Sequence, residues 1–259
     1  MPKFAANLSM LYTELPFLER FKAASESGFQ YIEYLFPYEW PVDTLATQLK
    51  QHQLQQVLFN LPPGNWGEGE RGIACLPDRI DEFRAGVDSA IDYANALGVK
   101  QLNCLSGLAP KNVDEGVLWQ TLVNNISYAA QRLNEHSITL LIEPINSKVD
   151  MPGFYIDTLD KALKIVDNVG LNNVKVQFDI YHMQIMQGDI LRTIENHLHD
   201  IQHIQFADCP GRHEPGTGEL NFKNIFNQLD HLNYTGWVSA EYVPKSTTPR
   251  SLDWFQSQK

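Results

Sequence analysis

The sequence predicts a single α/β domain, and within that class a closed (β/α)8 barrel, the TIM barrel. Short apolar or alternating runs, typical of strands, are separated by amphipathic stretches with helical periodicity, and this alternation repeats roughly eight times. The 259 residues are close to the length of one such barrel. No linker or change of composition divides the chain, so we expect residues 1–259 to form one domain. A doubly wound parallel sheet is the alternative fold with the same alternation.

The first half of the chain contains four expected strand–helix units. Strands are expected at residues 4–9, 31–36, 56–61 and 100–105, and helices at residues 17–27, 42–52, 79–97 and 117–133. Gly28 and Gly98 follow two of these helices, where a glycine typically ends a helix. Pro37 and Pro62 follow two of the strands and end them, because proline has no N–H for a sheet ladder.

The second half of the chain continues the same pattern. Strands are expected at residues 138–143, 174–179, 203–208 and 237–242, and helices at residues 159–169, 190–199 and 222–232. Pro144 ends the first of these strands, and Gly170 ends the helix that follows it. Eight expected strands in this order favour the closed barrel over the doubly wound sheet.

The main interruption of the pattern is the proline- and glycine-rich stretch at residues 61–78, LPPGNWGEGERGIACLPD. It contains a literal GxGxxG at residues 67–72, but no helix pattern starts at the third glycine, and Glu68 and Glu70 would repel a pyrophosphate. A dinucleotide site is therefore excluded. Loops of this length inside a compact domain are usually functional, so we expect a lid over the mouth of the barrel.

Charge and composition exclude several classes of partner. The formal net charge is −11 and the pI about 5.1, with no dense run of lysine and arginine, so nucleic acid and anionic membrane surfaces are unfavourable partners. No apolar run approaches the roughly 20 residues of a membrane helix. The three cysteines form no CxxC pair, and the N-terminus carries no signal-peptide pattern. We therefore expect a cytoplasmic protein; whether it forms a homo-oligomer stays open.

Polar side chains end four consecutive expected strands. In each strand the residues of one parity are apolar and can face the helices, whereas the other parity ends in Glu143, Asp179, Gln205 or Glu241. The carboxyl ends of parallel barrel strands meet at one mouth, so these four side chains are expected to converge. Three carboxylates so close need a counter-charge, and oxygen ligands of this kind suit Mg²⁺ or Mn²⁺. The alternative, four isolated strand-end hydrogen bonds, explains the shared parity less well.

Two further residues are candidates for binding a substrate. His182 follows Asp179 by three residues, which places it over the same mouth, and Arg212 lies in the loop after the next strand. A guanidinium binds a carboxylate with two hydrogen bonds. The alternatives are a structural histidine and a solvated surface arginine. Asn7 and Glu33, near the first two strand ends, are expected to be structural and are left out of the site.

Other chemistries find less support in the chain. Ser106 precedes Gly107 without the GxSxG context of a serine hydrolase. His197, His199 and His203 lie close together in the sequence, but the first two fall in an expected helix tail and should be solvated. A phosphodiester nuclease would need a histidine-rich multi-zinc cluster and a basic groove, and the sequence shows neither.

Longer motifs extend over nearly the whole chain. They are FAANLSM, LFPY, GERGIACLP, LNCLSG, LLIEPIN, PGFY, DIYHMQ, PGRHEPGTGEL and GWVSAEY. On these motifs the chain resembles the hydroxypyruvate isomerase family within the xylose-isomerase-like TIM barrels. The resemblance implies that Glu143 and Glu241 act as proton donor and acceptor. It also implies that Glu143, Asp179, Gln205 and Glu241 ligate a divalent metal, Mg²⁺ or Mn²⁺, which need not be essential in this branch.

The resemblance also predicts a reaction, the interconversion of hydroxypyruvate and tartronate semialdehyde through a metal-stabilised enediol. Related ketose epimerases carry a histidine at the position of Gln205, and a further glutamate soon after the one at the end of the 138–143 strand. The segment INSKVD has no glutamate there, so the isomerase branch is favoured. Two alternatives stay open: isomerisation of a longer 2-oxo-acid sugar such as 2-oxo-tetronate, and a catalytically silent sugar-acid-binding protein.

Overall fold

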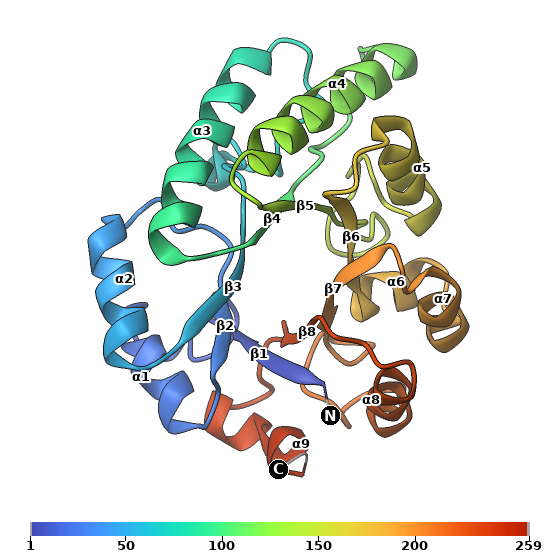
Figure 1. Ribbon diagram of the computed structural model, residues 1–259. Coiled ribbons are helices and arrows are strands. Elements are labelled where there is room, and N and C mark those ends of the chain that lie inside the picture. Colours follow the sequence, from blue (N-terminus) through green and yellow to red (C-terminus); the bar gives the residue numbers. More distant parts are fainter. Residues whose placement is uncertain (1, 258–259) are drawn as a thin grey trace.

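The computed structural model describes residues 2–257 and confirms the closed barrel (Figure 1). Within these residues eight parallel strands pair in chain order, and the last pairs with the first to close the ring. The strands are β1 Lys3–Asn7, β2 Tyr31–Glu33, β3 Gln55–Asn60, β4 Gln101–Cys104, β5 Thr139–Ile142, β6 Val174–Asp179, β7 Ile201–Phe206 and β8 Trp237–Ala240. The ring closure excludes the doubly wound sheet.

Helices surround the ring of strands, as the view along the barrel shows (Figure 1). They are α1 Glu19–Glu26, α2 Val42–Gln51, α3 Ile80–Leu97, α4 Glu115–Asn134, α5 Leu159–Val169, α6 Ile180–Met186, α7 Ile190–His197, α8 Phe222–His231 and α9 Asp253–Gln256, with 3-10 turns η1 Trp66–Glu68 and η2 Thr248–Ser251. In the described part of the chain, none of these helices has both the length and the apolar character needed to cross a membrane.

The structure differs from the sequence-based expectation mainly at the second and sixth strands. Strand β2 ends at Glu33, three residues earlier than expected, and Tyr34 then packs against the ring of Phe17. Directly after β6 the chain forms helix α6, where the sequence analysis placed no helix. Asp179 caps this helix by accepting a hydrogen bond from the backbone N of Tyr181 (2.8 Å), so one residue ends the strand and begins the helix.

The residues of the two parities in each strand lie in different surroundings, as the alternation predicted. Residues of one parity, such as Phe4, Leu140 and Phe206, belong to the large apolar cluster between the strands and the helices. The barrel interior contains a much smaller apolar cluster, formed by Ala5, Val57, Leu58 and Leu141 with Tyr31 and Trp237 packed against it. Because this cluster is small, polar side chains occupy the part of the barrel interior that is nearer the mouth.

The loop at residues 61–78 packs closely on the barrel. No helix starts at Gly72, which instead has a φ of +102° and lies so close to the backbone that a Cβ would be 2.3 Å from the carbonyl oxygen of Leu105. The backbone N of Cys75 donates to the oxygen of Ser106 (2.9 Å). Trp66, at the start of the 3-10 turn, packs against an apolar cluster that includes Leu105. The movement of this loop as a lid stays a prediction.

Candidate active site

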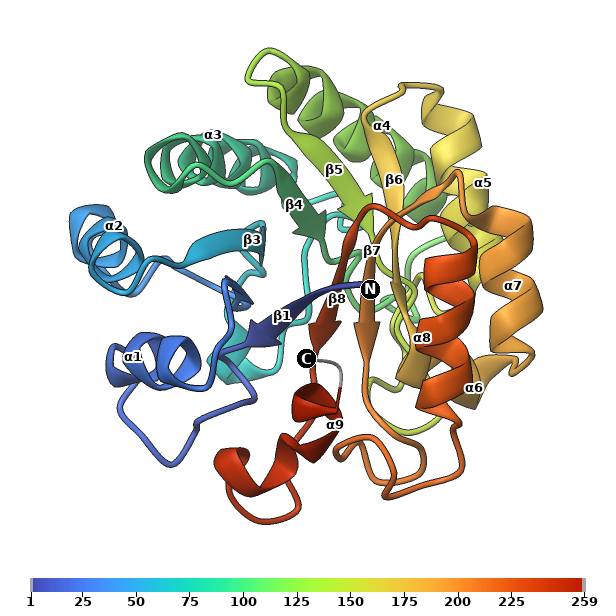
Figure 2. The ribbon, with the colours of Figure 1, turned by 60° about the horizontal axis from the view of Figure 1, so that its bottom comes forward.

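Polar side chains from all parts of the ring meet at the carboxyl ends of the strands. In Figure 2 the arrowheads of β4, β7 and β8 point toward the end of the molecule where the loop between β7 and α8 lies. The residues at this end include all four that the sequence analysis placed at strand ends, and each is at most 5% exposed. They are Asn7, Glu33, Asn60, Asn103, Glu143, Asp179, Gln205 and Glu241.

Four acidic or histidine side chains form a compact group at the mouth. Glu143, Asp179, His182 and Glu241 each offer one ligand atom, and these atoms lie within 4.8 Å of one another. Oδ2 of Asp179 is buried and has no hydrogen-bond partner. An ionised carboxylate oxygen in that state needs a cation or a donor. This donor set therefore fits a divalent cation such as Mg²⁺ or Mn²⁺, whose preferred ligands are oxygens.

The amide of Asn146 orients His182 in this group. Oδ1 of Asn146 accepts from the backbone N of Val149 and of Asp150 (both 3.0 Å), so its Nδ2 faces Nδ1 of His182 at 2.7 Å. Nδ1 therefore accepts, and the proton lies on Nε2, which is 3.5 Å from Oδ2 of Asp179. Burial, helped by Arg212, lowers the pKa of His182 well below its ordinary value. A neutral imidazole with Nε2–H directed into the mouth suits a hydrogen-bond donor better than a metal ligand.

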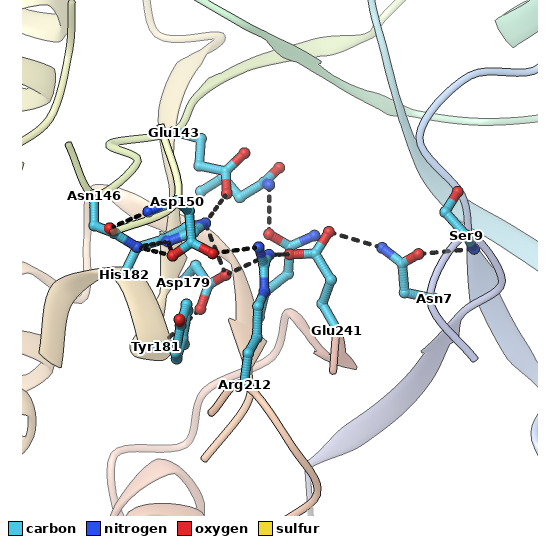
Figure 3. A network of polar contacts seen from close by, with 12 residues as sticks. Asn7, Ser9, Glu143, Asn146, Asp150, Asp179, Tyr181, His182, Arg212 and Glu241 are labelled. Carbon is cyan, nitrogen blue, oxygen red and sulfur yellow. Dashed lines mark hydrogen bonds and ion pairs between the residues drawn. The ribbon is translucent and has the colours of Figure 1, made fainter. Parts of the chain in front are cut away.

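Arg212 supplies a buried positive charge to the carboxylates (Figure 3). Its Nη2 lies 2.8 Å from Oε2 of Glu241 and 3.8 Å from Oδ2 of Asp179, and Nη1 lies 3.6 Å from Oδ1 of Asp150. The guanidinium is centred 5.2 Å from the ring of Tyr181. The side chain is only 18% exposed, so it is not the solvated surface arginine that sequence reasoning left open. It provides part of the counter-charge that the carboxylates need.

The acid–base properties of the site follow from burial. Burial and then Asp179 raise the pKa of Glu143 to about 8. Burial also raises the pKa of Glu241 well above its ordinary value, although Arg212 acts in the opposite direction, and burial raises the pKa of Asp179. Carboxyl groups in such contact titrate as a group. The pair Glu143 and Glu241 is therefore able to hold a proton near neutral pH, which a proton-transfer site needs.

The predicted ligand Gln205 lies at the same mouth and is hydrogen-bonded to two side chains of the barrel interior. Its Nε2 donates to Oε1 of Glu33 (2.7 Å), and its Oε1 accepts from Nε2 of Gln177 (2.5 Å). An amide oxygen has two lone pairs, so Oε1 keeps one for a further partner. Its role as a metal ligand stays a prediction.

Sequence reasoning missed several residues that contact the site. Asn7 was set aside as structural, yet its Nδ2 donates to both Oε1 of Glu33 (2.8 Å) and Oε1 of Glu241 (3.0 Å). Asn103 donates to Oε2 of Glu143 (2.9 Å), and Asn146 holds His182. Asn7 is the last residue of β1 and Asn103 the last but one of β4, and that position was the one available signal; Asn146 lies four residues beyond β5 and carried none.

Comparison with known proteins agrees with this geometry. Residues 21–258 match the sequence profile of the xylose isomerase-like TIM barrel family. The chain belongs to this family. It is 47% identical over 254 residues to the hydroxypyruvate isomerase of Escherichia coli K12, with 98% of both chains covered. It is 43% identical over 254 residues to the 2-oxo-tetronate isomerase of Pectobacterium atrosepticum, with 98% of this chain and 97% of that one covered.

Solved structures extend the comparison. A crystal structure from Brucella melitensis, described as AP endonuclease, family 2, superposes with a TM-score of 0.97 at 46% identity over the full length of both chains. D-psicose 3-epimerase from Clostridium cellulolyticum H10 has a TM-score of 0.77 at 18% identity, covering 95% of this chain and 87% of that one, which shows the shared fold alone. The resemblance stated from the motifs is confirmed, and the protein is an isomerase of this xylose isomerase-like family.

Proposed function

We propose that this protein interconverts hydroxypyruvate and tartronate semialdehyde (2-hydroxy-3-oxopropanoate) by proton transfer between two glutamates. The observation that carries the proposal is the buried pair Glu143 and Glu241 beside two donors, Arg212 and His182, in a site otherwise rich in carboxylates. The pair provides an acid and a base, whereas the donors provide recognition of an anionic substrate. The 47% identity to a hydroxypyruvate isomerase supports this choice of substrate.

Each residue has a distinct part in the proposed reaction. Arg212 binds the substrate carboxylate, and Nε2–H of His182 donates to a substrate oxygen. One glutamate of the pair removes a proton from C3 of hydroxypyruvate, which gives an enediol across C2 and C3. The other glutamate delivers a proton to C2, while O3 loses its proton to become the aldehyde oxygen and O2 gains one to become the hydroxyl.

Hydrogen bonds keep the two glutamates in place for this transfer. Asn103 donates to Oε2 of Glu143 (2.9 Å), and Asn7 donates to Oε1 of Glu241 (3.0 Å). These bonds leave Oε1 of Glu143 facing the mouth, 3.9 Å from Nε2 of His182. Because both carboxyls are held before substrate arrives, little reorganisation is needed at the moment of proton transfer.

A divalent cation would be held by Glu143, Asp179, Gln205 and Glu241. Two observations support this assignment: Oδ2 of Asp179 is buried without a hydrogen bond, and the buried carboxylates of the site outnumber the guanidinium of Arg212. When bound, Mg²⁺ or Mn²⁺ supplies an electrophile that polarises the carbonyl and hydroxyl oxygens of the substrate and stabilises negative charge on them. Arg212 remains the partner of the substrate carboxylate.

The test is a proton-exchange assay by NMR in D₂O, with hydroxypyruvate, purified protein, and Mg²⁺ or Mn²⁺ against EDTA. Deuterium uptake with formation of tartronate semialdehyde is expected. Glu143→Gln and Glu241→Gln should each lower turnover by at least about 100-fold, because each removes one proton carrier. Glu135→Gln, which changes a 61% exposed glutamate, is the matched control. Near-normal turnover in either site variant would refute the two-glutamate scheme.

A longer 2-oxo-acid sugar, such as 2-oxo-tetronate, is the second candidate substrate. The observation that favours it is the 43% identity to two bacterial 2-oxo-tetronate isomerases over at least 98% of this chain. Measuring kcat/KM for both substrates on one preparation decides between them, since both would use the same pair of glutamates. If neither substrate exchanges or turns over, a catalytically silent sugar-acid-binding protein becomes the better explanation.

A further inference from the structure

A second polar network lies in the barrel interior, and the proposed mechanism leaves its centre unused. That centre is Glu33 on β2, which is 1% exposed. Three side chains donate to its two oxygens. Nε2 of His203 lies 2.7 Å from Oε2, whereas Nε2 of Gln205 (2.7 Å) and Nδ2 of Asn7 (2.8 Å) both contact Oε1. These donors come from β1 and β7, so three strands meet at one carboxylate.

Glu33 accepts every hydrogen bond that it makes in this network. Nε2 of Gln101 lies 2.8 Å from Nδ1 of His203, so Nδ1 accepts and the imidazole proton lies on Nε2, facing Glu33. Burial acts to raise the pKa of Glu33, but His203 and the hydrogen bonds from Gln205 and Asn7 outweigh it, and the pKa lies below its ordinary value. Three donors and no acceptor around the two oxygens favour the ionised carboxylate, which is acceptor-only.

This arrangement determines which way two amides face. Because Nε2 of Gln205 is bound to Glu33, the opposite atom, Oε1, is the acceptor: it takes one hydrogen bond from Nε2 of Gln177 (2.5 Å) and keeps one lone pair for another partner. For Asn7, Nδ2 bridges Glu33 and Glu241 while Oδ1 accepts from the backbone N of Ser9 (3.0 Å). Without the acceptor at Glu33, only the hydrogen bond from Nε2 of Gln177 to Oε1 of Gln205 would hold this orientation. Because Oε1 of Gln177 is buried without a hydrogen-bond partner, the two amides are free to turn over together, and the NH₂ group of Gln205 would then face the mouth, where it would repel a cation.

We propose that Glu33 is a positioning residue: it fixes the amide of Gln205 with its oxygen available to a divalent cation, and it holds Asn7 against Glu241. Glu33 itself touches neither substrate nor cation. The inference rests on the proposed function in that Gln205 and Glu241 are taken as members of the site. Partners that orient metal ligands in this way typically change metal affinity 10- to 100-fold when they are removed.

Two substitutions distinguish the role of Glu33 in orienting the amides of Gln205 and Asn7 from the effect of its charge. Glu33→Met removes the charge and every acceptor. Glu33→Gln removes the same charge but keeps one oxygen for Gln205 and Asn7. Its NH₂ group then faces Nε2 of His203, which becomes an acceptor once the imidazole proton moves to Nδ1 and Gln101 turns its amide over. Tyr34→Phe is the matched control, because it removes the buried 2.5 Å hydrogen bond from Tyr34 to Gln56 in the same region without touching the site.

The first readout is Mn²⁺ affinity, measured by electron paramagnetic resonance without substrate. Relative to Tyr34→Phe, Glu33→Met should bind Mn²⁺ about 10- to 100-fold more weakly. Glu33→Gln should retain at least about tenfold more affinity than Glu33→Met, because its amides stay oriented. Equal losses in the two variants would assign the effect to charge and overturn the proposal, as would an unchanged affinity in Glu33→Met.

The second readout is the side-chain amide signals of Gln205 and Asn7 in ¹H–¹⁵N NMR spectra. In the unsubstituted protein their protons should exchange slowly with water, and in Glu33→Met quickly. Fast exchange in the unsubstituted protein would overturn the proposal even if Glu33→Met does not fold. The outcome is also separate from that of the proposed function: a protein that meets both expectations but does not isomerise hydroxypyruvate refutes the reaction and leaves the role of Glu33 standing.

Discussion

The loop that presents Arg212 is held closed by one buried carboxylate, and removing that carboxylate's charge should disable the site from a distance. Asp208 is fully buried and accepts from four backbone N–H groups of the loop. They belong to Cys209 (2.9 Å), Gly216 (2.8 Å), Gly218 (2.9 Å) and Leu220 (3.1 Å). The backbone N of Val243 donates to the oxygen of Arg212 (2.8 Å) and joins this loop to the end of β8.

Asp208→Asn keeps the shape of the side chain but turns an NH₂ group toward two of the four donors. A buried N–H without an acceptor costs about 1–3 kcal/mol, so two of them cost about 2–6 kcal/mol in the closed loop. The loop is able to open to water instead, so the equilibrium constant for its closure should fall at least about tenfold, since about 1.4 kcal/mol corresponds to a factor of ten. We expect Arg212 to be placed only when the loop is closed, so kcat/KM should fall with the closed population, by up to the factor lost in the closure constant.

The assay combines isomerase kinetics with hydrogen exchange at the backbone amides of Gly216 and Gly218. Both amides should be protected in the unsubstituted protein and lose protection in Asp208→Asn. Asp189→Asn is the control: it removes the same charge from a 59% exposed position with a φ of 50°, which asparagine tolerates. If Asp208→Asn keeps kcat/KM within about twofold and its glycine amides stay protected, the loop does not depend on Asp208 and the reasoning fails.

Three further outcomes are expected. Because burial and Asp179 raise the pKa of Glu143 to about 8, a cation must displace a proton from this carboxyl below that pH, so Mn²⁺ affinity should rise as the pH rises toward about 8. Titration calorimetry showing no pH dependence would contradict this. The carboxyl of Glu143 binds its proton more tightly in the folded protein than in the unfolded chain, so the cation-free protein should become less stable as the pH rises toward about 8. Thermal denaturation measures this change, and unchanged stability would argue against the raised pKa. Asn146→Ala should raise KM for hydroxypyruvate about tenfold with a smaller change in kcat, because His182 loses the amide that orients it, and a KM equal to that of the unsubstituted protein would exclude this role.

Local patterns in the chain were sufficient for the barrel and for the carboxylates at its mouth. Alternation with a period of two residues is a property of each strand alone, and all parallel strands of a barrel end at the same mouth. Glu143, Asp179 and Glu241 were therefore placed together before any contact was known. The helix of residues 159–169 was likewise located at both ends, because an amphipathic run and a following glycine are both local signals.

Local patterns failed where a side chain's partner lies far away in the chain. Helix α6 is a seven-residue helix whose start depends on the cap provided by Asp179, so its pattern is too short to predict it. Asn7 and Glu241 are 234 residues apart, and only closure of the ring between β1 and β8 brings them within 3.0 Å. Glu33 similarly looked like an ordinary strand end until the barrel interior placed three donors around it. Which polar groups face each other in a buried interior is set by long-range packing, because each of them must find a partner there once water is excluded.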